Sequence, residues 1–162
     1  MRRIVFFVIL FFGLSATSPA YADQVVIEGF ATFTYPSTVN LKKSGCQNIP
    51  FKYVTDENLP RENTVMLVAI TAVGSKRANG YAAWFSTQTS MEESSIAPMA
   101  RIGVLQVKVC REEFRSSPKD KSKRPGTNKG TYTLHFGAGN TDPITGTVLG
   151  DKIEIKRKIK FI

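Results

Sequence analysis

The sequence is poor in the residues from which most metal and nucleophilic sites are built. It has one histidine, one tryptophan and two cysteines among 162 residues. These counts exclude a metal centre with several histidine ligands, a four-cysteine zinc site and a disulfide-dense scaffold. Acidic residues are also few, since 13 of them stand against 22 lysines and arginines, for a formal net charge of +9. With 42% hydrophobic and 22% charged residues, the composition is typical of a single globular domain.

Long apolar runs are missing too, except near the N-terminus. Arg2 and Arg3 precede eleven apolar residues, 4–14, and Ala20-Tyr21-Ala22 follows as a small-residue cleavage site. These three parts are typical of a bacterial secretory signal peptide that is cleaved after Ala22. Eleven residues are too few to span a bilayer, which takes about 20. The alternative is an uncleaved N-terminal anchor.

We therefore expect residues 1–22 to be a cleaved signal peptide and residues 23–162 to be a single domain with a net charge of +7. No later segment is apolar for long enough to cross a membrane. The expected location is secreted or periplasmic.

Both cysteines, Cys46 and Cys110, belong to this expected mature chain. In an oxidising compartment two cysteines of one small domain usually pair, so we predict a disulfide between them. The alternative is two buried free thiols.

The mature chain has the residue pattern of strands. Alternating or β-branched segments recur between glycine, proline, asparagine and serine, and helical periodicity is nearly missing. The expected strands are 25–35 with a bulge at Gly29, 38–42, 47–55, 63–73, 80–88, 101–112, 130–136, 144–149 and 152–161. Turns are expected at Ala78-Asn79-Gly80, Gly137-Ala138-Gly139 and Gly150-Asp151, and one or two helical turns at the capping box Ser90–Glu93.

Seven to nine short strands in one domain predict an all-β fold, a two-sheet antiparallel β-sandwich with one disulfide. The sequence resembles bacterial secreted domains of the immunoglobulin or fibronectin type III kind over roughly residues 37–162. The resemblance is carried by Cys46 at a strand start, NTVMLVAITAV, GVLQVKVC, Pro125-Gly126 and the Gly130–Leu134 strand GTYTL. It implies an immunoglobulin-like sandwich and says little of function.

The resemblance also places the disulfide. In sandwiches of this kind the second and fifth strands are antiparallel neighbours, so the start of one lies beside the end of the other. Cys46 alternates with Ile49 and Phe51, and Cys110 with Val107 and Val109, which puts both cysteines off the core face or beyond the strand ends. We therefore expect a bridge within one sheet, unlike the cross-core bridge of antibody domains.

Positive charge is the most distinctive feature of the mature chain. It gathers in the segment 115–129 and again in the last strand. The candidate binding residues are Arg115, Lys119, Lys121, Lys123, Arg124, Lys129, Lys156, Lys158 and Lys160. If the last strand pairs with the strand that follows the segment, the two groups merge into one positive face that attracts anionic partners. The alternative is a solvated loop and an edge strand whose lysines prevent aggregation.

Catalytic signals are weak, and we predict no catalytic residue, no cofactor and no metal site. His135 alternates with Tyr132, Leu134 and Phe136, so it should face solvent or a sheet edge. Arg157 is the one charged residue expected on the apolar side of the last strand, near the sheet edge.

The function expected from these features is a non-catalytic binding module outside the cytoplasm. Its partner would be an anionic envelope polymer or an acidic protein; nucleic acid is not expected, because the basic segment lacks interleaved aromatic residues. A secreted enzyme inhibitor or accessory subunit is the alternative. Two further hypotheses are a hydrolase with carboxylate chemistry and a structural subunit that self-associates.

Overall fold

The computed structural model describes residues 22–57, 59, 64–85, 101–115, 123–141 and 148–162. The expected signal peptide up to residue 21, the capping box Ser90–Glu93 and the candidate residues Lys119 and Lys121 lie outside these ranges. The described residues form nine strands in two sheets, and no helix is found among them that is long and apolar enough to cross a membrane.

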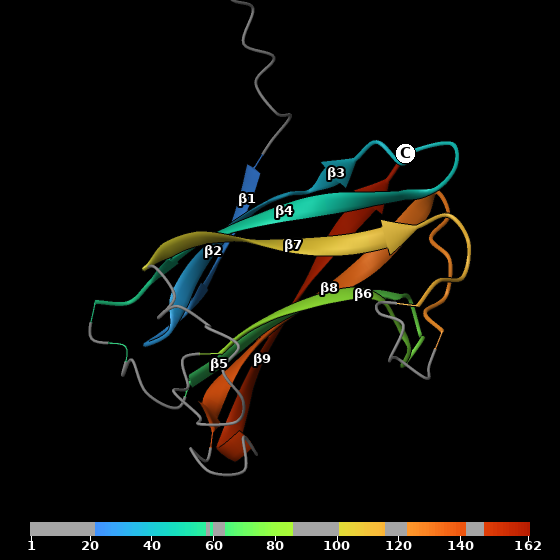
Figure 1. The fold of residues 1–162 in the computed structure, drawn as a ribbon. Coiled ribbons are helices and arrows are strands. Elements are labelled where there is room, and N and C mark those ends of the chain that lie inside the picture. Colours follow the sequence, from blue (N-terminus) through green and yellow to red (C-terminus); the bar gives the residue numbers. More distant parts are fainter. Residues whose placement is uncertain (1–21, 58, 60–63, 86–100, 116–122, 142–147) are drawn as a thin grey trace, which may run out of the picture.

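The four-stranded sheet has the order β1-β2-β4-β7 and is antiparallel throughout. Its strands are β1 (Ala22–Ile27), β2 (Ala31–Pro36), β4 (Cys46–Thr55) and β7 (Ile102–Cys110). In Figure 1, β4 and β7 run side by side across the view, in front of the second sheet.

The five-stranded sheet has the order β3-β9-β8-β5-β6. Its strands are β3 (Thr38–Val39), β5 (Thr64–Ala72), β6 (Ala78–Phe85), β8 (Gly130–Thr141) and β9 (Val148–Phe161). The two sheets confirm the predicted all-β sandwich. One pairing differs from the antiparallel prediction, because the two-residue strand β3 runs parallel to the end of β9.

The core lies between the sheets and follows from strict alternation of side chains. Ile49, Phe51 and Tyr53 point inward from β4, as predicted, and Phe136 meets them from β8. The Phe136 ring lies 5.3 Å from Phe33 and 6.0 Å from Phe51, centroid to centroid. Strand β5 is buried on the inward side and half-buried on the other, which agrees with its predicted central position.

The two sheets approach each other closely where β6 meets β7. A Cβ atom at Gly80 of β6 would lie 2.3 Å from the carbonyl oxygen of Lys108 in β7. Only glycine fits such an approach, because any side chain there would displace the neighbouring backbone.

At the opposite margin of the sandwich, β1 lies near β9, which on its outer side is paired by the short edge strand β3 only at Lys160 and Phe161 among the described residues. Arg157 is the register partner of the buried Leu134, so it lies on the side of β9 that faces the core. Its side chain is nevertheless exposed. This confirms its predicted place near the sheet edge. Burial raises the pKa of the nearby Tyr35; Asp23 raises it further and Arg157 opposes the shift.

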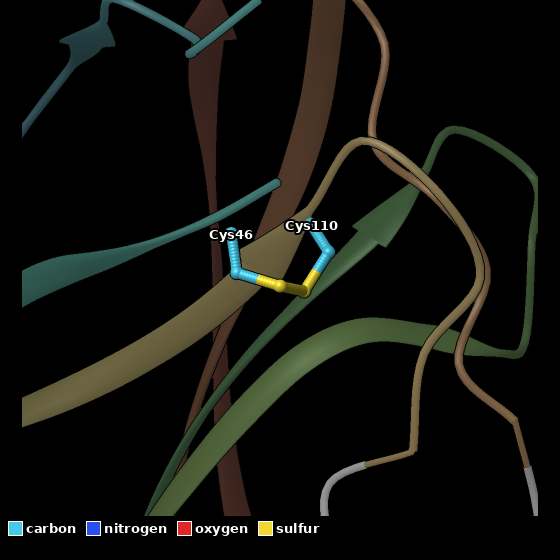
Figure 2. Close-up of a disulfide and its surroundings, with 2 residues drawn as sticks. All are labelled: Cys46 and Cys110. Atoms are coloured by element: carbon cyan, nitrogen blue, oxygen red, sulfur yellow. A yellow bond between two sulfur atoms is a disulfide. The ribbon is translucent and has the colours of Figure 1, made fainter. Parts of the chain in front are cut away.

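The predicted disulfide is present and joins Cys46 to Cys110. The two residues are direct register partners at the start of β4 and the end of β7, with Cα atoms 3.9 Å apart (Figure 2). The bridge therefore lies within one sheet, as expected. Cys46 is exposed whereas Cys110 is buried, so only the first is fully off the core.

The prediction of one strand over residues 25–35 is wrong. β1 and β2 are separate strands that pair as a hairpin, with Val25 opposite Phe33. Gly29 lies in the turn with a φ of 73°, a conformation that glycine adopts without steric cost. The residue taken for a bulge is therefore the turn itself.

Three predicted turns are also wrong, because each lies inside a strand. Asn79-Gly80 belongs to β6, Gly137–Gly139 to β8 and Gly150-Asp151 to β9. Turn-forming residues are tolerated here by irregular pairing, since the register shifts near Ile70 between β5 and β6 and near Ala138 between β8 and β9.

Candidate functional site

Three lysines stand in succession on the outer face of the five-stranded sheet. Lys156, Lys158 and Lys160 alternate with Ile159 and Phe161, which are buried in the core. Alternate residues of a strand lie about 7 Å apart on the same face, so the three lysines follow one another along the outer face of β9. We call Lys156, Lys158 and Lys160 the lysine ridge.

On the neighbouring strand β8, the register partners of the ridge are two threonines and a histidine. Thr131, Thr133 and His135 are the register partners of Lys160, Lys158 and Lys156. We expected the basic residues of segment 115–129 and of the last strand to form one positive face if the last strand paired with the strand after that segment. β9 does pair with β8. This pairing sets the ridge beside the strand that follows the basic segment.

His135 faces outward, as predicted, but its ring is engaged on both sides. Its Nδ1 lies 2.5 Å from Oε1 of Glu154, and its Nε2 lies 2.9 Å from the Thr71 hydroxyl. A carboxylate only accepts, so Nδ1–H donates to Glu154 and, in the neutral ring, Nε2 accepts from Thr71. The hydrogen bond from His135 lowers the pKa of Glu154 more than burial raises it, and Lys156, 3.8 Å away, lowers it further.

Thr71, His135 and Glu154 have the connectivity of a hydroxyl–imidazole–carboxylate relay. Thr71, however, pairs with Thr133 on one side and with Ala78 on the other. Acyl transfer needs backbone N–H groups directed at a developing oxyanion, and here the backbone groups beside the hydroxyl belong to strand pairing. The arrangement fixes the orientation of His135 and Glu154 at the base of the ridge.

Arg124 of the basic segment lies over Tyr81, on the same outer face as the ridge. Its guanidinium carbon is 4.2 Å from the ring centroid. Tyr81 is outward because its strand neighbours Gly80 and Ala82 point toward the core side. The register places Tyr81, Ala69, His135 and Lys156 in one row across four strands. Tyr81 and Lys156 are three strand spacings of about 4.8 Å apart, or roughly 14 Å. Arg124, over Tyr81, is therefore at about this distance from the ridge.

The base of the basic segment is fixed by backbone contacts. Phe114 and Arg124 form an antiparallel bridge, with N–H to carbonyl oxygen distances of 3.1 and 2.7 Å. Arg77 donates to the carbonyl oxygen of Lys123 at 2.6 Å. Arg115 and Lys123 are exposed beside this bridge.

Lys129 is exposed next to Gly130, whose register partner is Phe161. It therefore lies at the end of the sheet where the ridge finishes with Lys160. The structure thus brings Arg124, Lys129 and the ridge to one sheet, whereas Lys119 and Lys121 lie outside the described residues.

Sequence reasoning missed Asn79, which holds the basic segment in place. Its side chain is buried; Oδ1 accepts from the Ala72 N–H at 3.0 Å, and Nδ2 donates to the carbonyl oxygens of Pro125 and Gly126 at 3.3 and 2.8 Å. In the sequence, Asn79-Gly80 has the form of a turn, and nothing nearby reveals partners 46 and 47 residues away.

Among the described residues there is no group of three histidine, cysteine, aspartate or glutamate side chains that could hold a metal ion. Comparisons of the chain with protein-family models, with curated proteins and with solved structures found no match.

Proposed function

We propose that the protein is an extracytoplasmic, non-catalytic binding module that engages an anionic envelope polymer through the outer face of its five-stranded sheet. The observation that carries this proposal is the lysine ridge, three cations in line on one face with Arg124 and Lys129 on the same sheet. A line of like charges attracts a polyanion by releasing its counterions.

The geometry of the ridge favours an extended ligand. Its lysines repeat about every 7 Å on one face of a single strand, so a linear polymer with anionic groups at a similar repeat can pair with several of them at once. Threonines rather than acids flank Lys158 and Lys160, which leaves the local charge positive. Glu154 precedes Lys156 by two residues on the same face, and its carboxylate is shared with His135 and Lys156.

An immunoglobulin-like relationship supports a binding role, because such sandwiches present faces and loops to partners. The strand orders β2-β4-β7 and β9-β8-β5 fit strands A-B-E and G-F-C of that fold. In addition, the Tyr132 hydroxyl near the start of β8 accepts from the Asn128 N–H at 2.8 Å, as the corner tyrosine of immunoglobulin-like domains does. The bridge between β4 and β7 departs from the antibody pattern.

The disulfide supports the proposed location. Such bridges persist in oxidising compartments, and the N-terminal pattern of charge, apolar run and cleavage site gives a route to one. A secreted or periplasmic protein would meet anionic envelope polymers directly.

The test measures binding of the purified protein to immobilised dextran sulfate, and separately to polyglutamate, over a range of salt concentrations. The variant is Lys158→Ser with Lys160→Ser; the matched control is Lys52→Ser with Lys108→Ser, which removes the same charge from the other sheet. Each lost contact should reduce the slope of log affinity against log salt by about 0.7 to 0.9. We expect the ridge variant to lose nearly two such steps and the control to keep its slope.

Equal slopes in the two variants would overturn the ridge as the binding site. Binding to polyglutamate but not to dextran sulfate would replace the polymer by an acidic protein as the ligand. No binding to either probe would refute the proposal and direct attention to an inhibitor or accessory subunit that acts through apolar contacts.

A further inference from the structure

A row of exposed apolar side chains crosses the outer face of the four-stranded sheet. Val26, Thr32, Val54 and Ile102 are register partners on β1, β2, β4 and β7. Val26 is 56% exposed, Val54 51% and Ile102 70%, and Val104 in the next row is 46% exposed. We call Val26, Val54, Ile102 and Val104 the apolar row. The half-buried Thr32 lies between Val26 and Val54 in this row. Exposed apolar side chains that gather on one face, rather than scatter singly, indicate a surface that binds a partner.

Charge changes sign from one side of the apolar row to the other. On β4 the outward residues are Lys52, then Val54, and Asp56 follows just after the strand. An open hollow of about 340 Å³ beside the row is lined by Val26 and Val54 together with the acidic residues Glu28 and Asp56. The face therefore runs from a basic side through an apolar middle to an acidic side.

We propose that this face docks onto the same face of a second copy of the chain. A twofold axis along the apolar row would bring each apolar side chain against its counterpart. It would also make the strands of the two copies run in opposite directions. Lys52 of each copy would then lie opposite Asp56 of the other copy. Such an isologous contact uses one surface patch twice, and aligned sheet-on-sheet packing is a common geometry.

The charge pattern is the reason for choosing a second copy over a different protein. The face supplies its own complement, because its basic side matches its acidic side after the twofold rotation. Like charges would meet if the two copies packed with their strands parallel, which fixes the relative direction of the two sheets.

The size of the face sets the expected strength. Four strands at about 4.8 Å and roughly five residues along each give about 300 to 400 Å² per copy, less than the 800 Å² or so that each partner buries in a standard interface. The dimer should therefore be weak, with a dissociation constant between about 10 μM and about 1 mM.

The test is sedimentation equilibrium of the purified protein with its disulfide formed, from about 10 μM to about 1 mM at low salt. We expect a concentration-dependent monomer–dimer equilibrium. Val54→Lys should abolish it, since it places a charge in the middle of the row. Val73→Lys is the matched control, because Val73 is 71% exposed but lies in the turn just after β5, a strand of the other sheet.

A charge exchange tests the orientation. Lys52→Asp alone should weaken the dimer about tenfold or more, and adding Asp56→Lys should restore it. A monomer over the whole concentration range, or a dimer that tolerates Val54→Lys, would overturn the proposal. Failure of the double exchange to restore association would overturn the twofold arrangement. None of these variants touches the lysine ridge, so polyanion binding reports separately on the proposed function.

Discussion

The two sheets of this domain are held in different ways and present different outer faces. The four-stranded sheet is closed by a covalent bridge at one end and exposes apolar side chains in its middle. The five-stranded sheet has no cysteine; it is tied by hydrogen bonds from Asn79 to the basic segment and exposes a line of lysines. One fold thus separates an exposed apolar row, on which the proposed dimer rests, from a line of lysines, on which the proposed polyanion binding rests.

Removing the disulfide should have the largest effect and should weaken the four-stranded sheet first. The cysteines are 64 residues apart, and the chain-entropy model gives a loss of about 4 kcal/mol in the free energy of unfolding for a loop of this size. The measurement is urea unfolding of the double variant Cys46→Ala with Cys110→Ala. Hydrogen exchange should show β4 and β7 losing protection before β8 and β9.

The unmodified protein in reducing agent serves as the control, because it should lose the same stability without any substitution. A loss below about 1 kcal/mol in both would mean that the four-stranded sheet does not depend on its bridge.

Asn79→Ala should have an intermediate effect, on the other sheet. It removes three hydrogen bonds and leaves the Ala72 N–H and two carbonyl groups of the basic segment without that partner. Unsatisfied buried groups of this kind cost on the order of 2 kcal/mol in total stability. Urea unfolding measures the loss, and hydrogen exchange should rise around residues 123–127. The exposed Asn48 of β4 gives the control Asn48→Ala, which should change stability by less than about 0.5 kcal/mol.

These outcomes also bear on how much of the molecule follows from sequence. Alternation alone predicts the inward set of β4 and β8, since a strand with one buried face must repeat every second residue. The pairing of Cys46 with Cys110 was predicted from two cysteines, an oxidising compartment and the resemblance together.

What sequence reasoning could not supply depends on partners far along the chain. Asn79-Gly80 and Gly150-Asp151 carry local turn signals, but pairing with β5 and β8 keeps each inside a strand. The hairpin of β1 and β2 was missed because Gly29 has two readings, bulge or turn, and only the pairing of Val25 with Phe33 decides between them.

The candidate site was likewise predictable only in part. The alternation of lysines with Ile159 and Phe161 is visible in the sequence, and so is the outward side of His135. The contact of Arg124 with Tyr81 joins residues 43 positions apart, and no local pattern in the sequence links the two. Sequence therefore supplies the charges of the site, and tertiary contacts decide which of them share a face.

The smallest expected effect is on the acid beside the ridge. His135 and Lys156 hold the pKa of Glu154 below its ordinary value of 4.5, so the ionised carboxylate stabilises the folded state. That stabilisation is complete above pH 4.5 and is lost as the pH falls through the lower pKa of the folded protein. Because the side chain is about half exposed, solvent screening limits the effect to a few tenths of a kcal/mol.

The measurement compares the unfolding free energy of Glu154→Gln with that of the unmodified protein from pH 7 to pH 3. The difference should be present at neutral pH and should vanish in acid. Glu112→Gln, at an exposed glutamate just after β7, is the control and should show no such change. A difference that grows as the pH falls would contradict the assigned hydrogen bond.

The position of the disulfide has a mechanical consequence. Cys46 is the first residue of β4 and Cys110 the last residue of β7, so the disulfide encloses β4, β5, β6 and β7 within one covalent loop. A pull on the two ends of the chain passes through the sulfur–sulfur bond and bypasses everything inside that loop. The enclosed chain would extend by about 220 Å if it could unravel, at roughly 3.5 Å per residue over the 64-residue separation. In an oxidising environment the disulfide prevents this extension, so the chain lengthens little under tension. Reduction would allow the enclosed residues to extend.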